Sequence, residues 1–415
     1  MNVSVLIRLV VFLVLFSPNV QAQDGGVDFS GFYEHIYQIQ VISKDAGSKS
    51  SIGSGFQVSS EGHIVTNYHV VSAFVNAPNQ YNIKYATNDG QFGFLELLDF
   101  DIVSDIAVLK HPSPAAEAFE LDSSVLAKGE TVYALGNPGD WGIVMVPGPT
   151  NGLVEHSYED RVLFSGSLNS GMSGGPSLSH DGKVIGVNVA TAGSQLSFLV
   201  PVAKVHALLE KRRQLSQESF NVEIAAQILA WQQVRVQELI EMPWKSEEFN
   251  GKDLFGALRN DFQCWGSTNE SDTERKLELV RKYCSTGDDV YIDSGINSGQ
   301  ISFSFRHLKP VKVNDMQFSK MQSLSMYSEN DLDYEHATNF ACETDFIEAE
   351  ESATDSYHRV VTCIRAYKKL RGLYDSVVMV MSNAGSEVFK KQLAMSGLKK
   401  DHILQMNRRF VERSL

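Results

Sequence analysis

Short β-rich runs separated by turn residues dominate the chain from residue 30 to about residue 202. Six runs have the length and the β-branched content of strands: Ile36 to Ile42, Ser54 to Val58, Ile64 to Asn67, Ile106 to Leu109, Val132 to Leu135 and Val184 to Val189. Gly, Asn, Asp and Ser separate them, as is usual between strands that are close in sequence. This rhythm predicts an antiparallel barrel or sandwich.

The apolar period becomes helical from Val202 to Arg213. Apolar residues share one face of this segment, and three cations fill its last turn, where they suit the helix dipole. A chain of 415 residues is also too long for one ordinary core. We therefore expect a mainly β domain over residues 28–213 and a second domain over residues 214–415.

The second domain has the pattern of a mixed α+β fold. We expect helices near 222–241, 271–284, 352–370 and 400–413, and strands at 301–305 and 377–381. We can assign no motif in this half to a chemical step, so its role is open.

All four cysteines lie in the second domain: Cys264, Cys284, Cys342 and Cys363. Three pairings are possible, and we favour the two local ones, 264 with 284 and 342 with 363, because short loops cost least entropy to close. Zinc binding is the alternative to disulfide formation. The chain has no Cys-x-x-Cys or His-x-x-x-His spacing, so we expect no metal site.

The first 22 residues have the features of an export signal. Arg8 supplies a positive charge, Leu9 to Phe16 form an apolar run, and Val20 to Ala22 offer a cleavage site. The run is far shorter than the roughly 20 residues that span a bilayer. We expect a soluble, exported product, periplasmic or secreted, without a membrane anchor, in a compartment where cysteines form disulfides.

The charge of the chain argues against nucleic acid as a partner. Asp and Glu number 50 against 36 Lys and Arg, a formal net charge of −14. The electrostatic attraction that drives phosphate-backbone binding is therefore missing overall.

Three residues of the first domain supply the groups that nucleophilic acyl transfer needs. Ser173 lies in a glycine-rich turn, where the backbone amides of Gly171 and Ser173 can converge on an oxyanion. His69, at the end of a predicted strand, is a base of suitable pKa. Asp105 opens the next strand pattern and can orient the imidazole. This chemistry needs no cofactor.

The order of these residues separates two kinds of hydrolase. His, Asp and Ser follow one another in the order of chymotrypsin-type proteases. Residues 171–175 also spell Gly-x-Ser-x-Gly, but an α/β-hydrolase needs the order Ser, Asp, His and a following helix, whereas Pro176 and a strand pattern follow here. A binding protein that uses the protease fold as a platform is a further alternative, although it would not need all three residue types.

Six segments resemble, in order, the protease domain of the HtrA/DegP family. They are Gly53 to Phe56, Thr66 to Val71, Ser104 to Leu109, Gly136 to Pro138, Gly171 to Pro176 and Ser197 to Pro201. The resemblance spans roughly residues 30–213 and implies two six-stranded β-barrels, with the triad in the cleft between them and polypeptides as substrates. Residues 214–415 lack the carboxylate-binding loop of a PDZ domain, so we expect none.

The same resemblance implies a substrate pocket. Ser167, six residues before the nucleophile, would form its neutral floor, and Asn188, Val189 and Ala190 would form one wall. An unpaired Lys or Arg would be costly to bury there, so small or medium apolar side chains are expected, unless Asp160 reaches the pocket. The sequence leaves the oligomeric state open.

Overall fold

The computed structural model describes residues 29–124, 126–139, 141–193, 195–324, 335–348, 357–384 and 386–415. The signal peptide expected at residues 1–22 lies outside the described residues. Contacts divide the chain into a short unit, Met1–Gly31, and a large unit, Phe32–Leu415. The large unit contains residues from both sides of the boundary expected after residue 213.

Six strands close the first β-barrel. They are β1 (Ile36–Ser43), β2 (Lys49–Gln57), β3 (His63–Thr66), β4 (Tyr81–Ala86), β5 (Phe92–Asp101) and β6 (Ile106–Lys110), in the spatial order β1-β2-β3-β6-β5-β4. The 3-10 helix η1 (Ser30–His35) precedes β1, and helix α2 (Tyr68–Asn76) follows β3. Apolar residues such as Ile39 and Ile64, both fully buried, fill the barrel.

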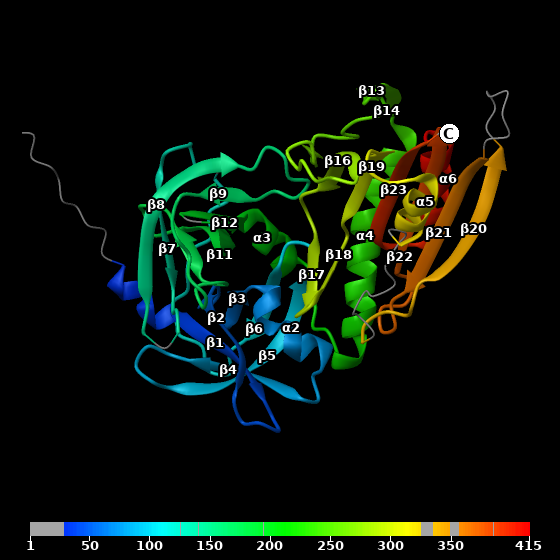
Figure 1. The fold of residues 1–415 in the computed structure, drawn as a ribbon. Helices are drawn as coiled ribbons and strands as arrows, with labels where there is room; N and C mark the ends of the chain where they lie inside the picture. The colour runs from blue at the N-terminus through cyan, green and yellow to red at the C-terminus, as the bar shows by residue number, and fades with distance from the viewer. Residues whose placement is uncertain are drawn as a thin grey trace, which may run out of the picture. The chain divides into compact units, whose positions relative to one another are not determined.

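A second closed barrel follows in the chain (Figure 1). It contains β7 (Thr131–Gly136), β8 (Val144–Leu153), β9 (Val162–Phe164), β10 (Pro176–Leu178), β11 (Val184–Gly193) and β12 (Leu196–Pro201), in the order β10-β11-β12-β9-β8-β7. Together the two barrels form a chymotrypsin-like double barrel, which confirms the predicted fold of this half.

Two local predictions in this half need correction. The strand expected to end at His69 ends at Thr66, and His69 lies in the first turn of α2. Helix α3 (Val202–Glu210) is shorter than the predicted 202–213 segment. It ends before Arg212, which has a positive φ of 46° that a helix cannot accommodate.

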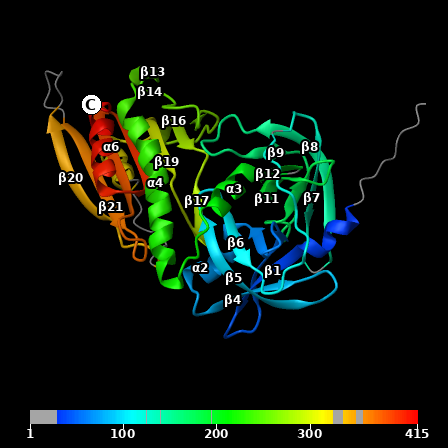
Figure 2. The ribbon, with the colours of Figure 1, turned by 180° about the vertical axis from the view of Figure 1, so that it is seen from behind.

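The rest of the chain is α+β, as predicted. After η2 (Gln217–Ser219) comes the long helix α4 (Phe220–Glu241), and the chain ends in α6 (Lys400–Glu412). The seven-stranded sheet has the order β15 (Phe262–Thr268), β16 (Leu277–Thr286), β19 (Ile301–Pro310), β23 (Glu387–Leu398), β22 (Tyr374–Ala384), β21 (Tyr357–Ala366) and β20 (Ala341–Glu348). Helices α4 and α6 cover one face of this sheet, and α5 (Asp315–Leu324) lies at the other (Figures 1 and 2).

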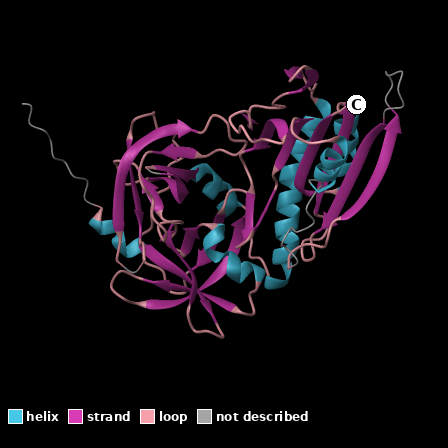
Figure 3. Ribbon diagram, in the orientation of Figure 1, coloured by secondary structure: helices cyan, strands magenta, loops and turns pink. Residues whose placement is uncertain are grey.

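Two small hairpins complete this region. One consists of β13 (Ser246–Phe249) and β14 (Lys252–Phe255), the other of β17 (Val290–Asp293) and β18 (Ile296–Ser298). Figure 3 shows strands in both halves of the chain.

Two of the predicted helices are wrong. Residues 271–284 and 352–370 instead contribute strands β16 and β21, although 352–356 lie outside the described residues. In β16, Leu277, Val280 and Cys284 are spaced three and four residues apart, which is also the spacing of apolar residues on one face of a helix. Pairing with β15 and β19 on both sides overrides that local pattern, because strand preference depends on the neighbouring strands.

Both disulfides join an edge strand of the sheet to its neighbour. Cys264 on β15 is bonded to Cys284 on β16, and Cys342 on β20 to Cys363 on β21. In each pair the two cysteines are directly opposite in the strand register, with Cα atoms 4.1 Å apart. These are the two local pairs favoured by the sequence.

The first barrel and the C-terminal region share one hydrophobic cluster. Tyr68 and Phe100 of the barrel belong to it together with Phe220 and Ile228 of α4 and Ile292 of β17. The rings of Tyr68 and Phe100 lie 5.3 Å apart, and those of Phe100 and Phe220 5.9 Å apart. The C-terminal region is therefore packed against the helix that carries His69.

Candidate active site

His69 is bound twice by one carboxylate. The backbone N–H of His69 donates to Asp105 Oδ1 at 2.9 Å, and the imidazole Nδ1 lies 2.7 Å from Asp105 Oδ2. Asn67, at the N-cap of α2, makes no side-chain capping bond. The Asp105 carboxylate thus accepts from a first-turn amide of α2 as well as orienting the imidazole, which explains why the helix begins next to His69.

The protonation pattern of this pair follows from its chemistry. An ionised carboxylate can only accept, so Nδ1 carries the proton and the neutral ring keeps its lone pair on Nε2. Burial lowers the pKa of His69, but the charge of Asp105 and its hydrogen bond outweigh burial, and the net pKa is raised; the charge of Arg161 opposes the increase. His69 is therefore a stronger base than a free imidazole.

The turn that presents Asp105 is held from several sides. Asp105 has a φ of +58°, a conformation that an Asp side chain tolerates better than most. Asp101 Oδ1 accepts from the amides of Val103 and Ser104 at 3.1 and 3.0 Å, and Asn67 Nδ2 donates to the Asp105 carbonyl at 2.8 Å.

Arg161, in the loop between β8 and β9, reaches the same turn from the second barrel. Its guanidinium donates to the carbonyls of Ser104 and Val103 at 3.3 and 3.4 Å. The turn that presents Asp105 is thus connected to the barrel that carries Ser173.

The loop of Ser173 depends on glycine and on Ser54 of the first barrel. Gly171 and Gly174 have φ values of +92° and +84°, and a Cβ on Gly174 would lie 2.2 Å from the Ser54 carbonyl oxygen. The Ser54 amide donates to the Ser173 carbonyl, and its hydroxyl donates to the Gly171 carbonyl, both at 2.7 Å. Ser54 therefore fixes the backbone on both sides of Met172.

This loop packs beside the start of α2. The same Cβ on Gly174 would lie 2.9 Å from the Asn67 amide nitrogen, two residues before His69. The Ser173 hydroxyl itself donates to the Val189 carbonyl at 2.5 Å. No hydrogen bond joins Ser173 to His69 within the described residues.

The two amides predicted to hold an oxyanion are available. Within the described part of the chain, the N–H groups of Gly171 and Ser173 donate to no acceptor. By contrast, the Met172 amide between them donates to the Asn169 carbonyl at 3.0 Å. Two unsatisfied donors beside a serine are what a developing oxyanion requires.

The predicted pocket residues differ in their exposure to solvent and in their hydrogen-bond partners. Ser167 is exposed. Asn188 is fully buried, donates to the Leu135 carbonyl at 2.8 Å and accepts from the Ser177 hydroxyl at 2.7 Å, so its side chain braces the barrel. Val189 offers its carbonyl to Ser173.

Ala190 pairs with Phe198 of β12 at a register shift of β11. Its side chain lies outside the described residues. The pocket roles of these four positions stay predictions.

Ser54, Asn67 and Arg161, which support the backbone around the candidate triad, carry no predicted role in the sequence. Ser54 and Asn67 lie inside two of the segments that resemble the HtrA/DegP family, next to glycines and to the candidate base His69. That position was a signal from which a supporting role could have been predicted. Arg161 lies in a loop of varied composition, and its partners are backbone carbonyls far away in the sequence. No local pattern therefore predicts its contact with the Asp105 turn.

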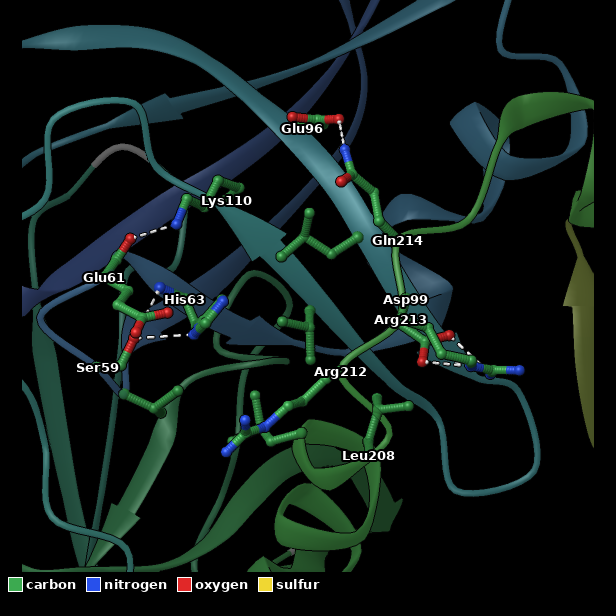
Figure 4. A pocket seen from close by; sticks show the side chains of 14 residues that line it. Ser59, Glu61, His63, Glu96, Asp99, Lys110, Leu208, Arg212, Arg213 and Gln214 are labelled. Carbon is green, nitrogen blue, oxygen red and sulfur yellow. Dashed lines mark hydrogen bonds and ion pairs between the residues drawn. The ribbon is translucent and has the colours of Figure 1, made fainter.

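A hollow elsewhere in the first barrel does not involve the triad (Figure 4). It lies where the chain leaves α3 and passes β5. Its polar groups largely bind one another: Arg213 pairs with Asp99, and Gln214 donates to Glu96 (Figure 4). These contacts fix the exit of the chain from the double barrel.

Two further findings concern metal ions and membranes. Among the residues that the structure describes, no group of three or more His, Cys, Asp or Glu is placed to hold a metal ion. None of the helices in these ranges has the length and apolar character needed to cross a bilayer.

Comparison with known proteins places the resemblance in the double barrel. Residues 53–187 match the family described as a trypsin-like peptidase domain. Human serine protease HTRA3 is 32% identical over 173 residues, which are 38% of this chain and 37% of that protein. Protease Do-like 1, chloroplastic, of Arabidopsis thaliana is 28% identical over 191 residues, 42% of this chain and 41% of that protein.

Among solved structures, the active form of the Rv3671c protease from M. tuberculosis is 20% identical, with a TM-score of 0.40. The match covers 45% of this chain and 84% of that chain. The chain spans less than half the length of the curated relatives above, and the matched region lies in its first half.

Proposed function

We propose that this chain, which carries an HtrA-like protease domain of the trypsin fold, is an exported serine endopeptidase. The observation that carries the proposal is the bond between His69 Nδ1 and Asp105 beside a glycine-lined serine loop with two unsatisfied amides. The similarity to serine proteases over the double barrel supports the same reaction.

In the proposed reaction His69 acts as the base. Nε2 takes the Ser173 proton while Oγ bonds to the scissile carbonyl carbon, and the amides of Gly171 and Ser173 bind the oxyanion. The imidazolium, stabilised by Asp105, gives the proton to the leaving amine as the C–N bond breaks. Water, activated by His69, then attacks the acyl-enzyme and restores the Ser173 hydroxyl.

This reaction requires one rearrangement. The Ser173 hydroxyl binds the Val189 carbonyl, so it must rotate about its Cα–Cβ bond to reach Nε2. Such rotamer changes cost little and are fast, and a substrate backbone that uses the Val189 carbonyl would release the hydroxyl.

We place substrates among envelope or extracellular polypeptides, with small or medium apolar side chains before the cleaved bond. The signal-like residues 1–22 support export. The two disulfides support an oxidising compartment.

A serine-directed fluorophosphonate probe tests the proposal directly. The purified chain should become labelled and should hydrolyse an unfolded protein substrate, and Ser173→Ala should do neither while keeping its circular dichroism spectrum. Ser179→Ala, in the turn that follows strand β10, is the control and should still be labelled. Labelling that survives Ser173→Ala, or a wild-type chain that neither reacts nor hydrolyses, contradicts the proposal.

A further inference from the structure

The β17–β18 hairpin of the C-terminal region lies directly against the helix that carries His69. The carbonyl of Ile292 in β17 accepts from the Tyr68 hydroxyl and from Asn76 Nδ2, both at 3.0 Å. Tyr68 and Asn76 are the first and last residues of α2. One carbonyl of the hairpin is therefore bonded to both ends of the helix.

The neighbouring residue of the hairpin reaches the imidazole itself. The ring of Tyr291 lies edge-on to His69, with centroids 6.2 Å apart and planes at 80°. The side chain of Ser72, whose hydroxyl donates to the His69 carbonyl at 3.0 Å, lowers the pKa of Tyr291, while burial raises it and prevails. Tyr291 thus lies against the imidazole ring, on a strand that packs beside the helix carrying His69.

A second element of the C-terminal region holds the acid. Gln227 of α4 accepts from the Ile102 amide at 2.8 Å and donates to the Phe100 carbonyl at 2.9 Å. Phe100 belongs to the end of β5, and Ile102 begins the turn that presents Asp105.

We propose that the C-terminal region completes the active site, with Tyr291 and Gln227 as positioning residues for His69 and Asp105. This rests on the proposed protease function. Tyr291 shields one side of the imidazole from water, and Gln227 fixes the turn that brings the carboxylate to Nδ1. In this proposal residues 214–415 hold His69 and Asp105 in position, and this role does not depend on whether they also bind a partner.

The two contacts predict opposite changes in the pKa of His69. Asp105 from the β5–β6 turn and Tyr291 from β17 contact its ring, and the charge of Arg161 from the β8–β9 loop also acts on it. Burial lowers the His69 pKa, so removing the Tyr291 ring should raise it. Asp105 raises the pKa, so loosening its turn through Gln227→Leu should lower it.

The test uses the full chain and needs no enzyme activity for its first readout. The pKa of His69 is measured from its imidazole proton signals by NMR, assigned by comparison with His69→Gln. We expect Tyr291→Ala to raise the pKa, Gln227→Leu to lower it, and Tyr291→Phe, which keeps the ring, to leave it near the wild-type value.

Two control variants separate positioning from general loss of packing. Tyr283→Ala removes a half-buried tyrosine from β16, and Gln232→Leu removes a side chain of α4 that donates to the Ser396 carbonyl instead. Neither should move the His69 pKa. If the controls move it as much as the variants do, or if both variants move it in the same direction, the inference is wrong.

The kinetic readout follows from the same variants. Tyr291→Ala and Gln227→Leu should lower kcat about tenfold or more with KM little changed, because small displacements of catalytic groups are costly. A higher KM with unchanged kcat and pKa would overturn positioning, since it would make Tyr291 a substrate contact. If the wild-type chain shows no hydrolysis, the proposed function fails. The His69 pKa measured by NMR still tests whether Tyr291 and Gln227 position His69 and Asp105.

Discussion

Both oxygens of the Asp105 carboxylate bind His69, one through the backbone amide and the other through the imidazole. The position of the helix and the orientation of the ring are therefore set by the same group. A change at Asp105 should affect the start of α2 as well as the tautomer of the base.

Asp105→Asn should lower kcat on the order of 10⁴-fold. The amide can still accept one bond, but its NH₂ favours the wrong imidazole tautomer. Asp101→Asn is the matched control, four residues earlier, because its remaining carbonyl oxygen can accept the same turn amides. Steady-state kinetics on both variants decide the matter: a large loss in Asp101→Asn with little in Asp105→Asn would contradict the assignment of the acid.

The activity should fall as the pH decreases through the raised pKa of His69, because the base must be neutral. The acid limb of kcat/KM is therefore expected above the ordinary value of 6.5. The same shift contributes folding stability that is fully present below the unfolded pKa and is lost as the pH rises through the folded pKa. A pH–rate profile with its acid limb below 6.5 would contradict the raised pKa.

Ser54→Ala should reduce both stability and turnover. It leaves the Gly171 carbonyl and the Asn137 amide, 2.7 and 2.9 Å from its hydroxyl, without this partner, at a cost of about 1 to 3 kcal/mol. Ser376→Ala, which removes an equally buried hydroxyl bonded to Asn407, is the control. Urea unfolding should show similar losses in both, whereas only Ser54→Ala should lower kcat.

Reduction of the disulfides should destabilise the sheet at its two edges. Each bond closes a loop of about 20 residues, which corresponds to about 3 kcal/mol. The cluster shared with the first barrel draws on α4 and β17 and on neither edge strand, so the double barrel should unfold last. Hydrogen exchange with and without reductant checks this order; equal loss of protection in β3 and β20 would contradict it.

Cleavage should favour peptides with Val, Ala or Leu before the scissile bond. Discrimination should be modest, about 1 to 3 kcal/mol per methylene. A peptide library profiled with the wild-type chain gives the preference directly. Dominant cleavage after Lys or Arg would mean that an acid such as Asp160 serves the pocket, and Asp160→Asn would then abolish that preference.

The strand pattern indicated an antiparallel barrel or sandwich, the resemblance to the HtrA/DegP family implied the double barrel, and the order of three residues indicated the candidate triad. Strand runs with turn residues between them, and the order of His69, Asp105 and Ser173, need no knowledge of distant neighbours. The start of α2 was misjudged because the acceptor for its first-turn amide is Asp105, a residue from another element. For the same reason the sequence predicts a helix at 271–284, where the structure has strand β16. Tyr291 lies in a segment without a motif, so the sequence does not associate it with His69.

The paired cysteines at the two edges of the sheet have a consequence for self-association. An unpaired edge can recruit a strand from another molecule, and both outer strands expose most of their residues. The disulfides keep each outer strand in register, so it cannot peel away to expose the next one. On β20, Glu343, Asp345 and Glu348 add like charges that a second copy in close apposition would meet. The disulfides thus limit strand exposure at both borders of the sheet, and on β20 the negative charges also oppose pairing with a second copy.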